Sequence, residues 1–158
     1  MPQQPEAQTD ASKLYRTTVT TDRGTIVMDL DPKLAPGTVN NFVGLARQGY
    51  YDGLTFHRVV PGFVVQGGCP SGSGTGGPGY KFADEPVVAE YTLGAVAMAN
   101  SGKNTNGSQF FICIDDCTSK LTKDYNLFGY VVDGVEIAQA TQVGDVMQSV
   151  VVEEVDRP

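Results

Sequence analysis

The sequence predicts one mostly β domain, built as a barrel or a sandwich. Short stretches rich in valine, threonine, isoleucine and aromatic residues recur along the chain, as in proteins with many short strands. The 19 glycines and 9 prolines supply turns between these stretches. Only two segments carry apolar residues at helical spacing, and the 158 residues are enough for one domain with a sizeable core.

Two strands open the domain as a β-hairpin. Residues 14–21 are rich in threonine, valine and tyrosine, and residues 24–30 alternate apolar with polar side chains. The tripeptide Asp22-Arg23-Gly24 between them is typical of a tight turn.

The next element is a helix that begins near Pro36 and ends before Gly49. Proline suits the first turn of a helix because its missing N–H would have no partner there, and glycine tolerates the backbone that ends one. Between these ends, four apolar residues recur at helical spacing: Val39, Phe42, Val43 and Ala46.

The rest of the chain returns mostly to strands. Residues 67–79 hold seven glycines, too many for regular structure, and residues 135–141 have the spacing of a second, short helix. Because closure removes exposed edges, so many strands favour a barrel whose open ends the helices could cover. The further strands are predicted over residues 55–60, 63–66, 95–99, 109–114, 127–132 and 149–155.

The first thirteen residues, Met1 to Lys13, are polar and are predicted to form a disordered tail. They have neither a basic start nor an apolar stretch, so they do not resemble a signal peptide. We therefore expect a domain over residues 14–158 and a cytoplasmic protein.

Charge and composition argue against several kinds of partner. The net charge is −7 and lysine and arginine do not cluster, which argues against nucleic acid or an anionic membrane. No run of eighteen apolar residues occurs, so no membrane span is expected. Cys69, Cys113 and Cys117 form no C-x-x-C pair, so we expect neither a disulfide framework nor a cysteine metal site.

Two familiar motifs lack the context they need. The glycine stretch contains G-x-G-x-x-G twice, but no helical pattern follows that could place a helix N-terminus at a pyrophosphate. His57, the single histidine, could serve a hydrolase, yet no G-x-S-x-G elbow is present to carry a nucleophile. No convergent ligands point to a metal, so neither metal nor cofactor is expected.

Two unusual stretches remain. Arg58 lies in an apolar strand between Phe56 and Val60, where a surface arginine is not expected. After a Pro-Gly break, Phe63 and Gln66 follow three residues apart, so strict alternation would place them on opposite faces unless the strand bends. A second stretch leads from a Met-Ala-Asn tripeptide through a polar loop into Gln-Phe-Phe-Ile.

At these stretches the sequence resembles the cyclophilins. FHRVVPGFVVQGG (residues 56–68) and MANSGKNTNGSQFFI (residues 98–112) look like the central signatures of that family. APGTVNNFVGLA and GTGGPGYKFADE are similar to it too, and the likeness runs from Leu14 to the C-terminus. The resemblance implies a closed eight-stranded antiparallel β-barrel capped by two helices, with the active site on its outer surface. It also implies a peptidyl-prolyl cis–trans isomerase that assists protein folding.

The resemblance assigns roles by motif position. Arg58 looks like the catalytic arginine, and Gln66 resembles the residue that holds it. Asn100 is similar to the asparagine that binds the substrate backbone, and Phe63 to a wall of the proline pocket. The other residues that the resemblance places against substrate are His57, Val64, Ala99, Ser101, Gln109, Phe111, Leu121 and Tyr125.

The expected partners are proline-containing peptides and unfolded protein clients of a monomeric enzyme. Cyclophilins also bind the cyclic peptide cyclosporin in the same groove. This chain departs from the family at Val64, Lys120 and Tyr125, where methionine, tryptophan and histidine are common. Because that tryptophan usually contributes to cyclosporin binding, we expect weakened cyclosporin inhibition.

Two other functions stay open at this point. A non-catalytic chaperone or scaffold module could bind proline peptides in the same groove, although binding alone does not require Arg58. A hydrolase that uses His57 would need partners for which the sequence gives no sign. An isomerase needs neither nucleophile nor base, because it only has to prefer the twisted amide over either planar form.

Overall fold

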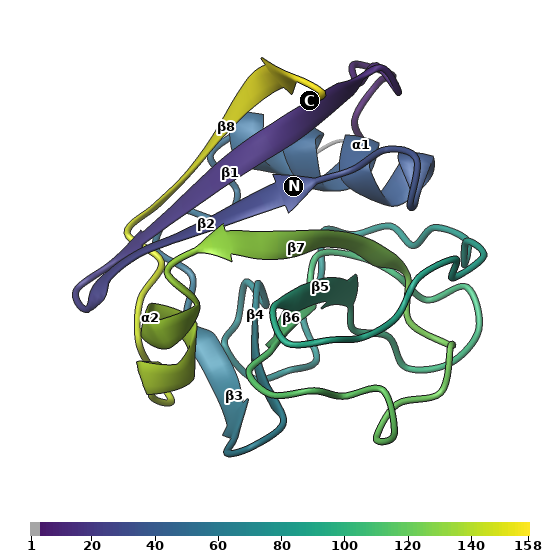
Figure 1. Ribbon diagram of the computed structural model, residues 1–158. Coiled ribbons are helices and arrows are strands. Elements are labelled where there is room, and N and C mark those ends of the chain that lie inside the picture. Colours follow the sequence, from purple (N-terminus) through teal and green to yellow (C-terminus); the bar gives the residue numbers. More distant parts are fainter. Residues whose placement is uncertain (1–3) are drawn as a thin grey trace.

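The computed structural model describes residues 4–158, which form one sheet of eight antiparallel strands and two helices (Figure 1). Residues 1–3 of the predicted tail lie outside the described part of the chain. The helices are α1 (Pro36–Arg47) and α2 (Val135–Ala140). The strands are β1 (Lys13–Thr21), β2 (Gly24–Leu30), β3 (Phe56–Val60), β4 (Val64–Gly67), β5 (Ala95–Met98), β6 (Phe110–Cys113), β7 (Leu127–Asp133) and β8 (Ser149–Asp156).

The predicted order of strands and helices is confirmed. β1 and β2 form the expected hairpin, with a register that runs from Tyr15 opposite Leu30 to Thr21 opposite Gly24. The glycine-rich stretch after β4 contains neither helix nor strand up to residue 79. Local patterns were sufficient here because turn residues and strand periodicity act over a few neighbouring positions.

The expected closed barrel is not confirmed, because the sheet curls into an open half-barrel. Its strand order is β3-β4-β6-β5-β7-β2-β1-β8, which leaves β3 and β8 as the two edges. The outer side of the β3 edge is met by the loop before β8 and not by β8 itself. Phe56 N–H donates to the Asp145 carbonyl at 2.9 Å, and Thr55 and Val146 form one isolated bridge.

Helix α1 begins and ends where the sequence predicts, but its N-terminus is capped from a distant loop. The Glu85 carboxylate accepts hydrogen bonds from the backbone N–H groups of Gly37 and Thr38 at 2.9 and 2.7 Å. An acidic group there satisfies unpaired N–H groups and interacts favourably with the helix dipole. At the other end, Gly49 has a φ of 74°, a left-handed backbone that favours glycine.

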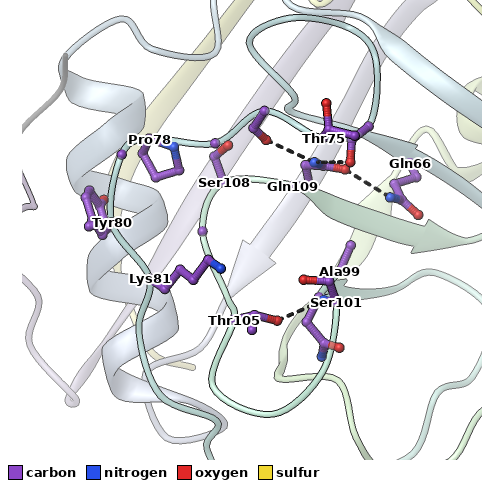
Figure 2. A pocket seen from close by; sticks show the side chains of 16 residues that line it. Gln66, Thr75, Pro78, Tyr80, Lys81, Ala99, Ser101, Thr105, Ser108 and Gln109 are labelled. Atoms are coloured by element: carbon purple, nitrogen blue, oxygen red, sulfur yellow. Dashed lines mark hydrogen bonds between the residues drawn. The ribbon is translucent and has the colours of Figure 1, made fainter.

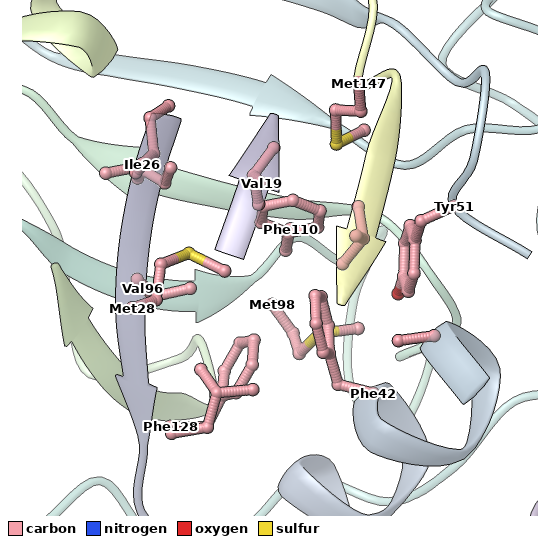
Figure 3. Close-up of a cluster of buried hydrophobic side chains, with 14 of the residues drawn as sticks. Val19, Ile26, Met28, Phe42, Tyr51, Val96, Met98, Phe110, Phe128 and Met147 are labelled. Atoms are coloured by element: carbon pink, nitrogen blue, oxygen red, sulfur yellow. The ribbon is translucent and has the colours of Figure 1, made fainter. Parts of the chain in front are cut away.

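The concave face of the sheet and α1 enclose a buried core, which we call the inner core. Phe42 of α1 stacks on Tyr51 with ring centroids 4.6 Å apart and meets Phe110 edge-on at 5.3 Å. Figure 3 shows these rings together with Met98 and Phe128. The inner core also includes Val65 of β4, Val96 of β5 and Ile112 of β6.

A second apolar group, which we call the outer cluster, lies on the opposite face of the same three strands. It exists because successive residues of a strand point to opposite faces. The long connections that follow β4 and β6 run beside it (teal and green in Figure 1). Its buried members are Val64, Tyr91, Ala95, Ala97, Phe111, Cys113, Cys117 and Leu127.

The residues before β1 contact the domain. Gln8 N–H donates to Asn40 Oδ1 of α1 at 2.8 Å, and Arg157 donates to the Ala11 carbonyl at 3.0 Å. In the part of the chain that the structure describes, neither helix has the length and apolar character needed to cross a membrane.

Candidate active site

A cavity of about 290 Å³ opens on the outer face, above the outer cluster. We call it the outer cavity. It brings together residues from β3, β4 and β6 and from the loops after β5 and β6. It is lined by nine of the residues that the sequence predicts for the site: Arg58, Phe63, Val64, Gln66, Ala99, Asn100, Phe111, Leu121 and Tyr125.

The arginine of the site is oriented by the strand register. Arg58 of β3 lies directly opposite Gln66 of β4, after a shift in register between Phe56 and Arg58. Because directly paired residues project to the same face, the two side chains meet. Arg58 Nη1 donates to Gln66 Oε1 at 3.2 Å, while the rest of the exposed guanidinium remains free to bind a ligand.

Phe63 joins the same site without breaking the alternation of β4. The strand begins only at Val64, and Phe63 belongs to the turn before it, where its N–H donates to the Val60 carbonyl at 3.0 Å. Val64 and Gln66 therefore share the outer face by alternation, whereas Phe63 reaches it from the turn. This turn is the bend that the three-residue spacing required.

The walls of the outer cavity are apolar and well packed. Val64 and Phe111 are only 2% and 4% exposed. The Phe111 ring meets Tyr125 edge-on with centroids 5.6 Å apart, a favourable geometry for two aromatic rings. Leu121 completes the wall from the loop after β6. The cavity thus offers a small apolar surface beside one cation.

Asn100 is held by a loop that is distant in sequence. Its Nδ2 donates to the Asp124 carbonyl at 2.9 Å, and its Oδ1 accepts from Gly102 N–H at 3.2 Å. Tyr91 ties the same loop down, because its hydroxyl donates to the Tyr125 carbonyl at 2.6 Å. Asp124 and Tyr91 are not predicted from the sequence, since Asp124 acts through a backbone oxygen and Tyr91 belongs to no motif.

Ser101 and Gln109 line a second, larger cavity of about 810 Å³ that adjoins the first (Figure 2). We call it the neighbouring cavity. The two share Gln66, Ala99 and Asn100, so a peptide could cross from one to the other. The glycine-rich loop forms the far wall of the neighbouring cavity.

His57 lines neither cavity and faces the glycine-rich loop, where a side chain added at Gly74 would lie 3.5 Å from its Nε2. Burial and the nearby Arg58 lower the pKa of His57, which favours the neutral imidazole. Its buried Nδ1 has no hydrogen-bond partner among residues 4–158. Without a carboxylate to orient the imidazole, His57 is not positioned as the base of a hydrolase.

Lys120 stands at the edge of the site, where the family often has tryptophan. Its Nζ donates to the Gly62 carbonyl at 2.6 Å and so ties the loop after β6 to the turn that carries Phe63.

Within residues 4–158, no cluster of three histidine, cysteine or acidic side chains could hold a metal ion.

Comparison with known proteins gives the same result as the geometry. The chain matches the family described as "Cyclophilin type peptidyl-prolyl cis-trans isomerase/CLD" over residues 16–157. It is 52% identical over 134 residues to peptidyl-prolyl cis-trans isomerase B of Bacillus subtilis, a match that covers 84% of this chain and 93% of the relative.

Solved structures agree. A Cryptosporidium parvum cyclophilin type peptidyl-prolyl cis-trans isomerase is 30% identical and superposes with a TM-score of 0.82, covering 92% of this chain and 99% of that one. A second structure of that protein, in the presence of the dipeptide Ala-Pro, has a TM-score of 0.80 at 29% identity, covering 87% and 98% of the two chains.

The fold and the site define a member of the cyclophilins, and the chain belongs to that family. It is a peptidyl-prolyl cis–trans isomerase, which accelerates rotation about the peptide bond that precedes proline. The non-catalytic alternative is therefore not favoured.

Proposed function

We propose that the outer cavity is the catalytic site and that Arg58 is its catalytic residue. The observation that carries this proposal is the placement of the Arg58 guanidinium, held by Gln66, beside a cavity walled by Phe63, Val64 and Phe111. A proline ring is apolar and compact, so it suits these walls. The amide before it would then lie within reach of Arg58.

The chemistry follows from the electronic structure of the amide. Resonance makes rotation about the C–N bond cost about 18–20 kcal/mol. In the twisted state the prolyl nitrogen becomes pyramidal and regains a lone pair, to which a guanidinium can donate. That hydrogen bond is absent in either planar form, so it lowers the barrier and not merely the energy of binding.

The magnitudes show that Arg58 cannot act alone. Uncatalysed prolyl isomerisation takes tens to hundreds of seconds. Turnover of about 1000 per second would require a barrier lower by about 7–8 kcal/mol. A hydrogen bond from a charged donor supplies about 1.5–3 kcal/mol. We assign the rest to a fixed proline ring, an anchored peptide backbone and partial exclusion of water.

The other predicted residues divide between these tasks. Phe63, Val64, Phe111 and Leu121 would hold the proline ring, and Tyr125 would lie on the rim of the pocket. Asn100 would bind the backbone of the peptide, with Ala99, Ser101 and Gln109 beside it, and Gln66 would help to hold Arg58 and the peptide backbone. His57 lies outside both cavities and is assigned no contact with the peptide.

We further propose that the clients are unfolded proteins with accessible prolines, and that the enzyme is a cytoplasmic monomer. Binding of cyclosporin is expected to be weak, because Lys120 supplies no aromatic surface. Light scattering of the purified protein would test the monomeric state, and a dimer at micromolar concentration would contradict it.

Two-dimensional exchange NMR on an Ala-Pro peptide tests the role of Arg58. Wild type is expected to raise the cis–trans exchange rate by orders of magnitude, and Arg58→Ala to lose most of that gain while remaining folded. Arg47→Ala is the matched control, since Arg47 is an exposed arginine on α1 that binds Gln8.

Two outcomes would contradict the proposal. If wild type binds the peptide but leaves exchange at the uncatalysed rate, the groove only binds proline. If Arg58→Ala exchanges the peptide as fast as wild type, another group stabilises the twisted amide.

A further inference from the structure

The glycine-rich loop beside the active site makes more hydrogen bonds than a loop that only connects two strands would need. We propose that this loop orients Arg58 through Gln109 and Gln66, and that Cys69 is the residue that fixes the loop in place. Cys69 and Gln109 are then positioning residues for catalysis. The inference rests on the proposed role of Arg58.

A continuous chain of hydrogen bonds joins the loop to the guanidinium. Gln109 Nε2 donates to the carbonyls of Gly74 and Gly76, both at 3.0 Å. Gln66 Nε2 donates to Gln109 Oε1 at 3.2 Å, and Arg58 Nη1 donates to Gln66 Oε1 at 3.2 Å. Figure 2 shows Gln109 between Gln66 and the loop at Thr75. We call this chain the relay.

The two ends of the relay determine the orientation of both amides. Backbone carbonyls only accept hydrogen bonds, so Gln109 must turn its NH₂ group to the loop and its oxygen to Gln66. Gln66 must then turn its NH₂ group to Gln109 and its oxygen to Arg58. Arginine only donates, so this is the single amide orientation that satisfies every member. The loop carbonyls thereby decide which atom Arg58 meets.

The loop carbonyls are in turn held by a ladder of small polar side chains. Gly76 N–H donates to Cys69 Sγ at 3.3 Å, which closes the loop on itself. Cys69 Sγ also lies 3.3 Å from the Ser71 hydroxyl. The ladder continues from Ser71 to Ser73 at 2.7 Å and from Ser73 to Thr75 at 2.8 Å. Alternate residues of the loop therefore bind one another.

Cys69 is built into this loop as an acceptor. The residue is only 1% exposed, and a side chain at Gly76 would lie 3.2 Å from its sulfur and 2.9 Å from Ser71 Oγ. Burial raises the pKa of the Cys69 thiol. Hydrogen bonds from the Ser71 hydroxyl and from the N–H groups of Gly76, Gly74 and Ser71 outweigh burial and lower that pKa to about 6. A thiolate accepts hydrogen bonds more strongly than a thiol does.

The first test removes the middle of the relay without adding charge. Gln109→Met keeps the length of the side chain and loses its three hydrogen bonds. If the relay orients Arg58, kcat falls by about three- to tenfold, the range of one net hydrogen bond, while KM changes by less than about twofold. The matched control is Gln139→Met on α2, whose Nε2 donates to the Ile114 carbonyl and which takes no part in the relay.

The second test addresses the anchor. Cys69→Ala removes the acceptor and is expected to lower kcat like Gln109→Met, whereas Cys69→Ser keeps an acceptor and stays within about twofold of wild type. If both residues act through one path, the double variant Cys69→Ala/Gln109→Met loses no more than Gln109→Met alone. Side-chain ¹⁵N relaxation of Arg58 should show a more mobile guanidinium in each impaired variant.

The outcomes separate this inference from the proposed function. If Arg58→Ala abolishes catalysis but Gln109→Met leaves kcat and Arg58 mobility unchanged, the relay has no role. If Gln109→Met raises KM at constant kcat, Gln109 contacts peptide and does not orient Arg58. If Arg58→Ala itself leaves exchange unchanged, the proposed function fails and the relay with it. Should Cys69→Ala fail to fold, Gln109→Met alone decides.

Discussion

The inner core and the outer cluster are built on opposite faces of β4, β5 and β6. The inner core is closed to solvent, whereas the outer cluster borders the open outer cavity. The inner core is filled by large rings such as Phe42 and Phe110, which are 0% exposed. The outer cluster combines a few rings with small residues, among them Ala95, Ala97 and Cys113. In the strand ladder, Ala97 and Gln66 both lie opposite Phe111.

One sheet can thus stabilise the fold on one face and form the outer cavity on the other. Large side chains that interdigitate leave no space and stabilise the fold. Small side chains beside Phe111 leave the space that forms the outer cavity. Because neighbours in a strand belong to different faces, adjacent substitutions should have different consequences.

The largest effect is expected for Phe110→Ala in the inner core. Loss of a buried ring that touches Phe42, Tyr51 and Phe56 should lower the free energy of unfolding by about 3–5 kcal/mol. Urea denaturation would measure it. A loss below 1 kcal/mol would mean that the inner face is less closely packed than the ring contacts indicate.

The adjacent Phe111→Ala should instead act mainly on catalysis. Its ring forms a wall of the outer cavity, so kcat/KM for an Ala-Pro peptide should fall by about 10- to 100-fold. Its cost in stability should be smaller than that of Phe110→Ala, because fewer rings pack against it. If Phe111→Ala lowered the free energy of unfolding more than Phe110→Ala, or lowered kcat/KM less, the two faces would not have separate roles.

A gain is expected from Lys120→Trp at the rim of the outer cavity. An aromatic ring there would extend the apolar surface, so cyclosporin should bind about three- to tenfold more tightly. Isothermal titration calorimetry of both proteins gives the two dissociation constants. Equal affinity would show that the absence of tryptophan is not what limits cyclosporin binding.

The smallest effect concerns an ion pair whose two residues belong to neither the inner core nor the outer cluster. Arg157 Nη2 lies 2.7 Å from Asp31 Oδ1, and this hydrogen-bonded partner lowers the pKa of Asp31 below its ordinary 3.8. The carboxylate therefore stabilises the fold above pH 3.8, and this contribution is lost as pH falls through the lower, folded pKa.

Arg157→Gln tests that sign. The variant should be less stable than wild type at neutral pH. The difference should shrink as pH falls below 3.8 and through the lower, folded pKa of Asp31, where the carboxyl becomes protonated in the folded chain too. Urea denaturation from pH 2 to 7 measures it. Isomerase activity at pH 7 should match wild type, because the pair lies outside the outer cluster.

Much of the site could be predicted because its residues lie in two long motifs. Arg58, Gln66, Asn100 and Phe111 were assigned from those motifs, and the structure brings them to one cavity. The support around them could not be predicted in the same way. Asp124 contributes a backbone carbonyl to Asn100, and the glycine-rich loop contributes carbonyls to Gln109. Because every residue has a backbone carbonyl, no residue type in the sequence marks these contacts.

Turn chemistry and periodicity are local properties, so neighbouring residues in the sequence predict the order of the elements and their approximate ends. Three features required the tertiary structure: the sheet stays open between β3 and β8, Glu85 caps a helix 48 residues away, and Cys69 and Gln109 both bind Gly76. Each of these depends on contacts between segments distant in sequence, and such contacts leave no pattern in neighbouring residues.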